Sequence, residues 1–190
     1  MDDETIFLYG VPGSGKTTIA RMLSESLGWD NLELDKVRDN ARTGKSEESD
    51  LFLLEGTTTA WQRFGGLDKE NAIIGLLAVR KSIQPYVLDK IDGHAKPLIA
   101  EAAFLDPKEC GTRGRCILIS CSDMLRHHSQ FFDHREKSAK TDLQFEAGRH
   151  LQEFMLEEAR ELGIVVVDNS GNIQDAADAI ILMVSSSSNR

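Results

Sequence analysis

The strongest constraint on the fold is the stretch YGVPGSGKTTIA at residues 9–20, where an apolar run turns into a glycine-rich segment. Gly10 and Gly15 lack a Cβ atom, so the backbone can turn sharply there and approach a ligand closely. The pattern Gly10-x-x-x-x-Gly15-Lys16-Thr17 is that of a P-loop, whose backbone amides bind phosphates at the start of a helix. The residues predicted to bind the nucleotide are Gly10, Val11, Pro12, Gly13, Ser14, Gly15, Lys16, Thr17 and Thr18.

The elements on either side fit this motif. Residues 5–9 form a short apolar run typical of a strand, and apolar residues at helical spacing follow Lys16 until Gly28. An ordinary glycine-rich turn is the alternative, and the complete pattern with its flanking elements disfavours it. We therefore predict that ATP and Mg²⁺ are the cofactors, with Lys16 at the β- and γ-phosphates and the Thr17 hydroxyl on the metal.

Five strand-like runs alternate with helical stretches along the chain. Continuous apolar runs such as CILIS and GIVVVD are typical of strands buried on both faces. The alternation predicts an α/β fold, a doubly wound parallel five-stranded sheet in a nucleotide-kinase-like three-layer sandwich with a lid. A long helix is expected over residues 141–162, started by Thr141 and Gln144 in a capping box. The expected strands are residues 5–9, 31–34, 97–102, 115–120 and 163–167.

Length and charge restrict the class of protein. The 190 residues predict one kinase-sized domain over residues 1–184, followed by a frayed serine-rich tail at 185–190. A formal charge of −9 argues against nucleic acid or an anionic membrane as a partner. The acidic start MDDETIF carries no leader pattern, and three cysteines suggest reduced, buried thiols. We expect a cytoplasmic monomer or homodimer that acts on a small molecule.

Three charged residues follow predicted strands, where ligands of parallel sheets bind. Asp35 ends the second strand and could orient or deprotonate an acceptor hydroxyl, while Arg38, one helical turn on, could bind an acceptor carboxylate or phosphate. A helix cap with a solvated arginine explains the pair equally well. Glu101, near the end of the third strand, is predicted to hold Mg²⁺ with Thr17; a solvated glutamate is the alternative.

Residues 124–140, MLRHHSQFFDHREKSAK, form a cationic segment in an acidic chain. The segment lies between the fourth strand and the long helix, where a lid could close over the transferred phosphate. Arg126 and Arg135 are the predicted contacts of that phosphate, because guanidinium groups match its oxygens. The alternative is an ordinary solvated charged helix.

A cluster of threonines lies beside a tryptophan in LLEGTTTAWQRFGG, residues 53–66. Thr58 and Trp61 are candidates for a polar substrate pocket. A helix start with a packed tryptophan explains them nearly as well.

Several stretches together resemble the 2-phosphoglycerate kinase family: GVPGSGKTT, LDKVR, TTTAW, LIAEAAFLDP and the block from HHSQFFDHRE to IVVVDN. The resemblance implies a small P-loop kinase that phosphorylates a small anionic hydroxy acid. It implies Asp35 and Arg38 near the acceptor, and His128 and Arg135 in the closing segment. The family's Glu-Gly-x-His is replaced here by Glu101-Ala-Ala-Phe104, which leaves the acceptor open.

Two alternative functions remain at this point. A nucleoside or nucleotide monophosphate kinase shares the loop, the lid and the sheet. A non-catalytic ATP-binding regulatory module is the alternative of another class, although such a module has little use for a lid rich in arginine. The guanine-reading motif Asn-Lys-x-Asp is absent from the sequence, which argues against a GTPase switch.

Overall fold

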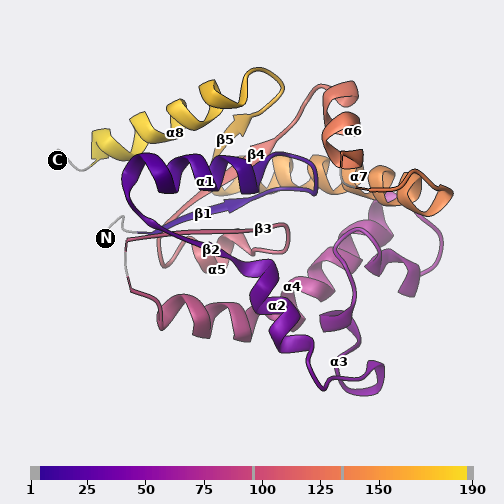
Figure 1. The fold of residues 1–190 in the computed structure, drawn as a ribbon. Coiled ribbons are helices and arrows are strands. Elements are labelled where there is room, and N and C mark those ends of the chain that lie inside the picture. Colours follow the sequence, from indigo (N-terminus) through magenta and orange to yellow (C-terminus); the bar gives the residue numbers. More distant parts are fainter. Residues whose placement is uncertain (1–4, 96, 134, 188–190) are drawn as a thin grey trace.

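The computed structural model describes residues 5–95, 97–133 and 135–187. Its centre is a five-stranded sheet in the order β2-β3-β1-β4-β5, in which every neighbouring pair is parallel (Figure 1). The predicted fold class is therefore confirmed. The strands are β1 (Thr5–Tyr9), β2 (Asp30–Glu33), β3 (Leu98–Ala102), β4 (Arg115–Ser120) and β5 (Val165–Asp168).

Strand β1 lies between β3 and β4, so the P-loop that follows β1 lies at the centre of the sheet's carboxyl edge. The register pairs Leu8 with Glu101 and Tyr9 with Ala102. This alignment brings the end of β3 directly beside the start of the P-loop. Residues after β1, β3 and β4 therefore meet at one edge, where ligands of open parallel sheets bind.

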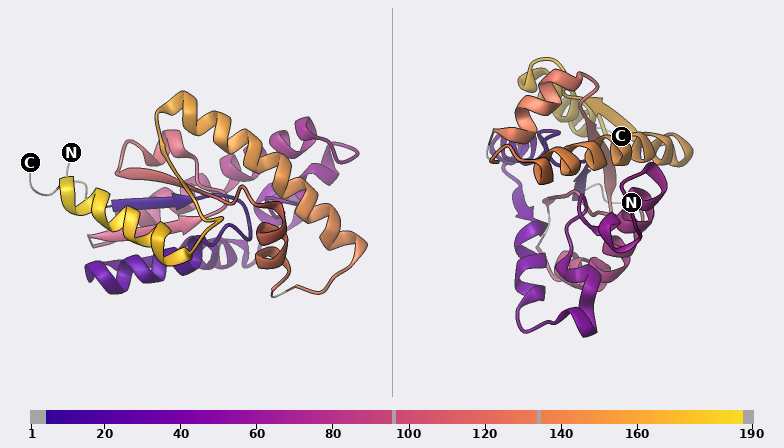
Figure 2. Two further views of the ribbon diagram at one scale, coloured as in Figure 1. Left: turned by 90° about the horizontal axis from the view of Figure 1, so that it is seen from above. Right: turned by 90° about the vertical axis from the view of Figure 1, so that its right-hand side faces the viewer.

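Helices cover both faces of the sheet, and the left view of Figure 2 shows the three layers, with α1 and α8 on one side and α7 on the other. Alternation along β1 builds both interfaces: Ile6 and Leu8 pack into the core under α1 and α8, while Phe7 and Tyr9 pack towards α4 and α7. The helices are α1 (Lys16–Leu27), α2 (Leu34–Arg42), α3 (Glu47–Leu54), α4 (Lys69–Asp92), α5 (Pro107–Cys110), α6 (Met124–Phe132), α7 (Ala139–Leu162) and α8 (Ile173–Ser187), with a 3₁₀ turn η1 (Ala60–Arg63).

A buried ion pair joins the two long helices on the second face. Arg80 of α4 donates to both carboxylate oxygens of Glu158 of α7, at 2.8 and 3.0 Å, and the two side chains are 2% and 9% exposed. Burial, reinforced by the Glu158 carboxylate, raises the pKa of the neighbouring Tyr9 hydroxyl. The fork geometry fixes α4 against α7 in one arrangement, because only that arrangement pairs both charges.

The start of α7 differs from the prediction. The helix begins at Ala139, and its cap is Ser138: the Ser138 hydroxyl accepts from the Thr141 amide at 3.3 Å, and the Thr141 hydroxyl accepts from the Ser138 amide at 2.9 Å. Thr141 is thus the third residue inside the helix, and Gln144 takes no part in the capping box. Only Thr141 is followed three residues later by glutamine, whereas the fold uses the earlier hydroxyl and lets Thr141 take the place of the glutamine.

The carboxyl-terminal prediction also needs correction. Helix α8 continues through Ser187, past the predicted tail boundary at residue 185. The Ser185 and Ser186 hydroxyls donate to the Ile181 and Leu182 carbonyls at 2.9 and 2.7 Å, so serines here extend the helix. Residues 188–190 lie outside the described part of the chain.

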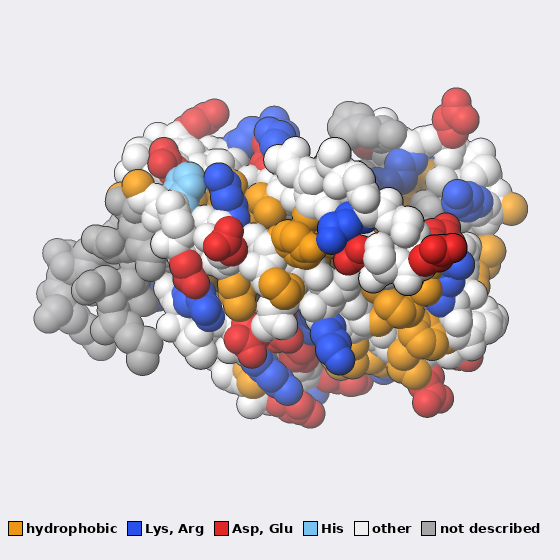
Figure 3. Space-filling model, turned by 90° about the horizontal axis from the view of Figure 1, so that it is seen from below, with side chains coloured by type: hydrophobic (Ala, Val, Ile, Leu, Met, Phe, Trp, Pro, Cys, Tyr) orange, Lys and Arg blue, Asp and Glu red, His pale blue; other side chains and the backbone are white. Residues whose placement is uncertain are grey.

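Three smaller findings complete the fold. Cys110, Cys116 and Cys121 are free and buried, as predicted. Within the described residues, no helix combines the length and the apolar character that crossing a membrane requires. Acidic and basic side chains are interspersed over the face shown in Figure 3.

Candidate active site

The P-loop adopts a conformation that only glycine tolerates at two positions. Gly15 has a φ of 92° and directly precedes α1. A Cβ atom on Gly15 would collide with the side-chain amide of Asn169, and one on Gly10 would collide with the carbonyl oxygen of Ile119. No side chain caps the start of α1, and its first turn holds no acidic residue. The helix start therefore offers its amides to an anion, which is the fit that a nucleotide phosphate requires.

Lys16 is folded back over this loop. Its side chain is buried, and Nζ donates to the Val11 carbonyl at 3.1 Å. Burial lowers the pKa of the Lys16 ammonium, while the nearby Glu101 carboxylate acts in the opposite direction. A cavity of about 270 Å³ opens beside it, lined by Gly13, Gly15, Lys16, Thr17, Thr18, Gln130, Asp133, Arg135 and Ile173. The ammonium is thus positioned to donate to a phosphate oxygen in place of the Val11 carbonyl when a nucleotide occupies the cavity.

Thr17 and Glu101 form the candidate metal site. The Thr17 hydroxyl donates to Glu101 Oε1 at 2.9 Å, and Glu101 is 3% exposed. Glu101 Oε2 is buried and has no hydrogen-bond partner within the described residues. Burial raises the pKa of the Glu101 carboxyl, against the influence of Lys16 and Thr17. An unsatisfied buried oxygen beside a hydroxyl suits a hard cation such as Mg²⁺, which commonly uses few protein ligands.

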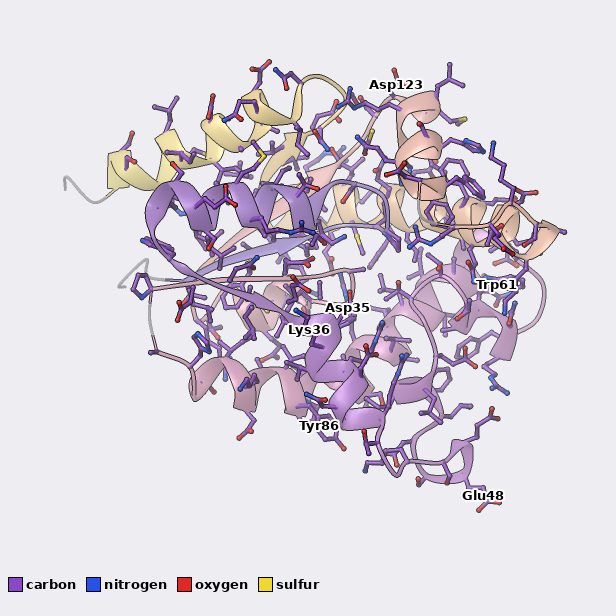
Figure 4. The ribbon with its side chains drawn as sticks, viewed as in Figure 1. Asp35, Lys36, Glu48, Trp61, Tyr86 and Asp123 are labelled. Carbon is purple, nitrogen blue, oxygen red and sulfur yellow. The ribbon has the colours of Figure 1, made fainter. Side chains whose placement is uncertain are left out.

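Asp35 and Arg38 lie together on the first turns of α2, and Figure 4 shows Asp35 where that helix begins, near the middle of the molecule. Their side chains pair at 2.8 Å, with Asp35 54% exposed and Arg38 only 17%. The Arg38 guanidinium lies 5.1 Å from the centre of the Phe104 ring, and its Nε is buried without a partner among the described residues. Glu33 occupies the cap position of α2 and Asp35 is the second residue of the helix, so Asp35 is not the cap.

The charge of Asp35 acts on the P-loop. Burial lowers the pKa of Lys16 and the Asp35 charge opposes that shift, whereas for Glu101 the Asp35 charge adds to the rise in pKa that burial causes. The structure therefore brings Asp35, Lys16 and Glu101 to one edge of the sheet, as the sequence predicted. Phe104 stands where the resembling family carries histidine, and here it supports the Arg38 guanidinium.

Thr58 and Trp61 are placed differently from the prediction. Both are buried, and the Trp61 indole donates to the Thr58 carbonyl at 3.0 Å. Gly75 of α4 allows this close packing, since a Cβ there would lie 2.7 Å from the Trp61 amide nitrogen. Trp61 lies on η1, well apart from Asp35 (Figure 4). These contacts correct the prediction of a pocket wall: the pair joins η1 to α4, which is the packed-tryptophan alternative.

The predicted lid segment contains a docked helix. Helix α6 lies against the P-loop, where His127 Nε2 is 2.9 Å from the Pro12 carbonyl. The Gln130 amide is oriented so that both its nitrogen and its oxygen have partners. The nitrogen donates to the Gly13 carbonyl at 2.7 Å, and the oxygen accepts from Arg126 Nε at 3.1 Å. Arg126 thus pairs with Gln130 on α6, one of the residues lining the P-loop cavity. Residues 124–132 therefore support the loop in this structure, and the closing motion expected of this segment stays a prediction.

Arg135 and His128 lie beyond this support. The Arg135 guanidinium lies 4.3 Å from the centre of the Phe131 ring, donates to the Phe131 carbonyl at 2.6 Å and lines the P-loop cavity. Its charge contributes to the lowered pKa of Lys16, which places it near the phosphate site. His128 packs between Phe132 and Phe145, at 4.4 and 5.1 Å between ring centres. His134, in the same segment, lies outside the described residues.

One residue directly after β5 contacts the P-loop and was not among the predicted site residues. Asn169, fully buried, donates from Nδ2 to the Ser14 carbonyl at 3.0 Å. Its loop is tied to the end of β4, where the Ser122 hydroxyl donates to Asp168 at 2.5 Å. Burial opposes ionisation of Asp168, but hydrogen bonds from Ser122 and Ser170 outweigh it and lower its pKa. The available signal was position: Asn169 directly follows a strand of the parallel sheet.

Comparison with known proteins identifies the family. A sequence model described as an AAA domain matches residues 6–110, which is more than half of the chain. This chain belongs to that family. The matched region of this AAA domain holds the P-loop, Asp35, Arg38 and Glu101.

Curated relatives match only a short portion of this AAA domain. A shikimate kinase from Chlorobium phaeobacteroides is 51% identical over 51 residues, which cover 27% of this chain and 26% of the relative. The chloroplastic shikimate kinase 3 of Oryza sativa subsp. japonica is 39% identical over 54 residues, 28% of this chain and 18% of the relative. The chain thus matches about a quarter or less of the length of these relatives. They are kinases, in agreement with the predicted class, but their names do not match the finer resemblance to 2-phosphoglycerate kinases.

Solved structures resemble this AAA domain over almost its whole length. The shikimate kinase from Acinetobacter baumannii in complex with shikimate has a TM-score of 0.63 at 19% identity, covering 96% of this chain and 93% of that one. The deoxyadenosine kinase from M.mycoides with bound dATP has a TM-score of 0.53 at 13% identity, covering 95% and 99%. At these identities the likeness establishes the shared fold alone.

Proposed function

We propose that this protein is a kinase that transfers the γ-phosphate of ATP to a hydroxyl of a small anionic metabolite. The observation that carries the proposal is the Asp35–Arg38 pair, held at 2.8 Å beside the P-loop lysine. A carboxylate and a guanidinium together suit an acceptor that carries both a hydroxyl and an anionic group. The names of the curated relatives, all shikimate kinases, support a hydroxy acid in general.

The proposed roles follow from the placement of each side chain. Asp35, half exposed, would accept a hydrogen bond from the acceptor hydroxyl and turn its oxygen towards the phosphate. Arg38, resting on the Phe104 ring, would bind the acceptor's anionic group with the donors that Asp35 does not occupy. Lys16 and Arg135 would stabilise the charge that develops on the transferred phosphate oxygens.

Thr17 and Glu101 would hold a Mg²⁺ ion that accompanies the nucleotide. When bound, such an ion neutralises charge on the β- and γ-phosphates. In this chain the Thr17 hydroxyl and the unpartnered Glu101 Oε2 are the oxygens available to it. The glycines of the P-loop leave the room that the phosphates need.

Turnover with a panel of acceptors tests the proposal. The protein, ATP and Mg²⁺ are incubated with shikimate, 2-phosphoglycerate, a nucleoside, AMP or no acceptor, and phosphorylated products are identified by mass spectrometry. We expect acceptor-dependent ADP release with the phosphate on a hydroxy acid. Phosphorylation of the nucleoside or AMP would instead support the nucleotide-kinase alternative. Slow ATP hydrolysis that ignores every acceptor would support a regulatory module and contradict the proposal.

A further inference from the structure

One histidine links the P-loop to the opposite layer of the fold. His127 of α6 is fully buried, and its two ring nitrogens face different elements. Nε2 lies 2.9 Å from the Pro12 carbonyl of the P-loop, and Nδ1 lies 3.2 Å from Arg149 NH1 of α7. The ring also packs against Phe145, at 5.0 Å between centres. The imidazole is therefore enclosed by the loop, by its own helix and by α7.

These partners determine which ring nitrogen carries the proton. A guanidinium only donates hydrogen bonds, so Nδ1 must accept from Arg149. A carbonyl only accepts, so Nε2 must carry the hydrogen and donate to Pro12. His127 is thereby fixed as the neutral Nε2–H tautomer. Burial lowers the pKa of its imidazole, and the charges of Arg149 and Lys16 act in the same direction, against the contribution of the Pro12 carbonyl.

Arg149 is itself held to the end of β4. NH1 of Arg149 donates to the Cys121 carbonyl at 2.9 Å. Gln152, one turn further along α7, accepts from the Cys121 amide at 2.9 Å and donates to the same carbonyl at 3.0 Å. Three hydrogen bonds therefore fix α7 to the end of β4. Arg149 makes one of them and also contacts His127, which donates to Pro12.

The contact acts on the part of the loop that must present its amides to phosphate. A P-loop binds anions only while its carbonyls point away from them. Donation from His127 holds the Pro12 carbonyl on the side of α6, and donation from Gln130 holds the neighbouring Gly13 carbonyl. Gly13 permits this approach, because a Cβ there would lie 2.9 Å from the Phe131 Cα atom.

We propose that His127 is a positioning residue for nucleotide binding. Arg149 holds the imidazole in place, and the imidazole in turn holds the Pro12 carbonyl, so that the P-loop keeps its phosphate-binding conformation. The proposal rests on the proposed function in one respect, that the P-loop binds a nucleoside triphosphate. His127 itself touches no phosphate. Its effect passes through the backbone of the loop.

The first test measures binding of a non-hydrolysable ATP analogue with Mg²⁺ by calorimetry. We expect His127→Phe to fold, to retain the ring packing and to bind about five- to tenfold more weakly, the effect of one lost hydrogen bond. His127→Gln, which keeps an amide donor, should recover most of that loss. His94→Gln is the matched control, since His94 pairs with Asp30 at the other end of the sheet; it should bind as the wild type does.

A double-mutant cycle tests whether Arg149 acts on the P-loop through His127. Arg149→Met should weaken binding several-fold in the wild-type background, because Nδ1 then loses its donor and the tautomer is free. In the His127→Phe background the same substitution should have no further effect on the dissociation constant. Equal effects in both backgrounds would overturn the proposed route through His127.

The tautomer gives an independent readout that does not depend on any variant. Long-range ¹H–¹⁵N correlation spectra of the wild type at pH 7 should show His127 protonated at Nε2 and bare at Nδ1. Protonation at Nδ1, or wild-type affinity in His127→Phe, would overturn the inference. If the wild type itself binds no nucleoside triphosphate, the proposed function fails first, so the two failures are distinguishable.

Discussion

The Thr17 hydroxyl donates a 2.9 Å hydrogen bond to Oε1 of Glu101, which joins the first turn of α1 to β3. The other carboxylate oxygen of Glu101 is buried without a partner in the described residues. Thr17 is thus held in place before any cation is bound. Glu101 meanwhile carries an unsatisfied oxygen, a feature that lowers stability and that a bound cation would relieve.

Replacing Glu101 with glutamine should separate stability from metal binding. Because the folded pKa of Glu101 is raised, its carboxyl supports folding fully below about pH 4.5 and loses that contribution as the pH rises through the folded pKa. Glu101→Gln should therefore raise the free energy of unfolding at pH 7 by about 1 kcal/mol in the absence of ligand. Thermal unfolding at pH 4 and pH 7 measures this. An equal effect at both pH values would contradict the assignment.

The same variant should lose the magnesium-dependent part of nucleotide binding. Wild-type protein should be stabilised more by ATP with Mg²⁺ than by ATP with EDTA, whereas Glu101→Gln should show little difference. Glu109→Gln, on the surface of α5, is the control. A retained magnesium effect in Glu101→Gln would place the metal elsewhere.

Arg135 is predicted to act on the rate of phosphate transfer. Its guanidinium lines the P-loop cavity and contacts only Phe131 among the interactions described, so its removal should leave the fold intact. Arg135→Ala should lower kcat about 100-fold or more, the cost of removing one cation aimed at the developing charge. Arg113→Ala, which breaks a surface pair with Asp92, should leave kcat unchanged. Wild-type turnover by Arg135→Ala would exclude the proposed role.

Lys16→Ala should abolish transfer and leave thermal stability close to that of the wild type. The Lys16 side chain is buried, and among the described residues its one hydrogen bond is to the Val11 carbonyl, so little structure depends on it. We expect a loss of at least about 100-fold in kcat, measured with the acceptor that the panel identifies. A variant that still transfers phosphate at the wild-type rate would remove the P-loop from the mechanism.

The sequence predicted most of what local patterns encode. Strands β1 and β4 have the predicted bounds, because each is a short, largely apolar run that is buried throughout, apart from the half-buried Arg115 at the start of β4. The P-loop and the pairing of Asp35 with Arg38 were predictable from spacing alone. The α7 start was displaced because Ser138 and Thr141 both offer a capping hydroxyl, and only the fold selects between them.

Other parts of the site depend on contacts that no local pattern reveals. Asn169 meets Ser14 across 155 positions of the chain, and His127 meets Pro12 across 115. Both are polar side chains whose buried partners are backbone carbonyls, which carry no sequence signature. For Trp61 the local pattern suggested the wrong environment. Its neighbouring threonines suggested a polar pocket, whereas its indole donates to the Thr58 carbonyl.

Arg42 should control the acceptor site through the position of α2. Its Nε donates to the Leu53 carbonyl at 2.8 Å, and NH2 donates to the Leu54 and Glu55 carbonyls at 3.0 and 3.1 Å. These bonds fix the helix that carries Asp35 and Arg38 to the end of α3. Arg42→Ala should raise KM for the acceptor about tenfold and leave KM for ATP unchanged.

The matched control for Arg42 is Lys36→Ala on the same helix. Lys36 is largely exposed and pairs only with Glu33, so its removal should change neither KM value. A rise in KM for ATP in Arg42→Ala would show that α2 positions the nucleotide instead. Global unfolding of the variant is detected by circular dichroism, and Arg42→Lys then provides the milder substitution.

The Arg80–Glu158 pair should behave as a buried unit with strongly non-additive mutations. Removing one partner leaves the other charge buried and unpaired, so Glu158→Leu or Arg80→Met should each lower the free energy of unfolding by about 3–5 kcal/mol. The double variant Arg80→Met, Glu158→Leu should recover much of that loss, since apolar side chains of similar size fill the space between α4 and α7. Denaturant unfolding of the three variants gives the coupling energy. Additive losses would mean that the two charges do not stabilise each other, despite the 2.8 and 3.0 Å contacts.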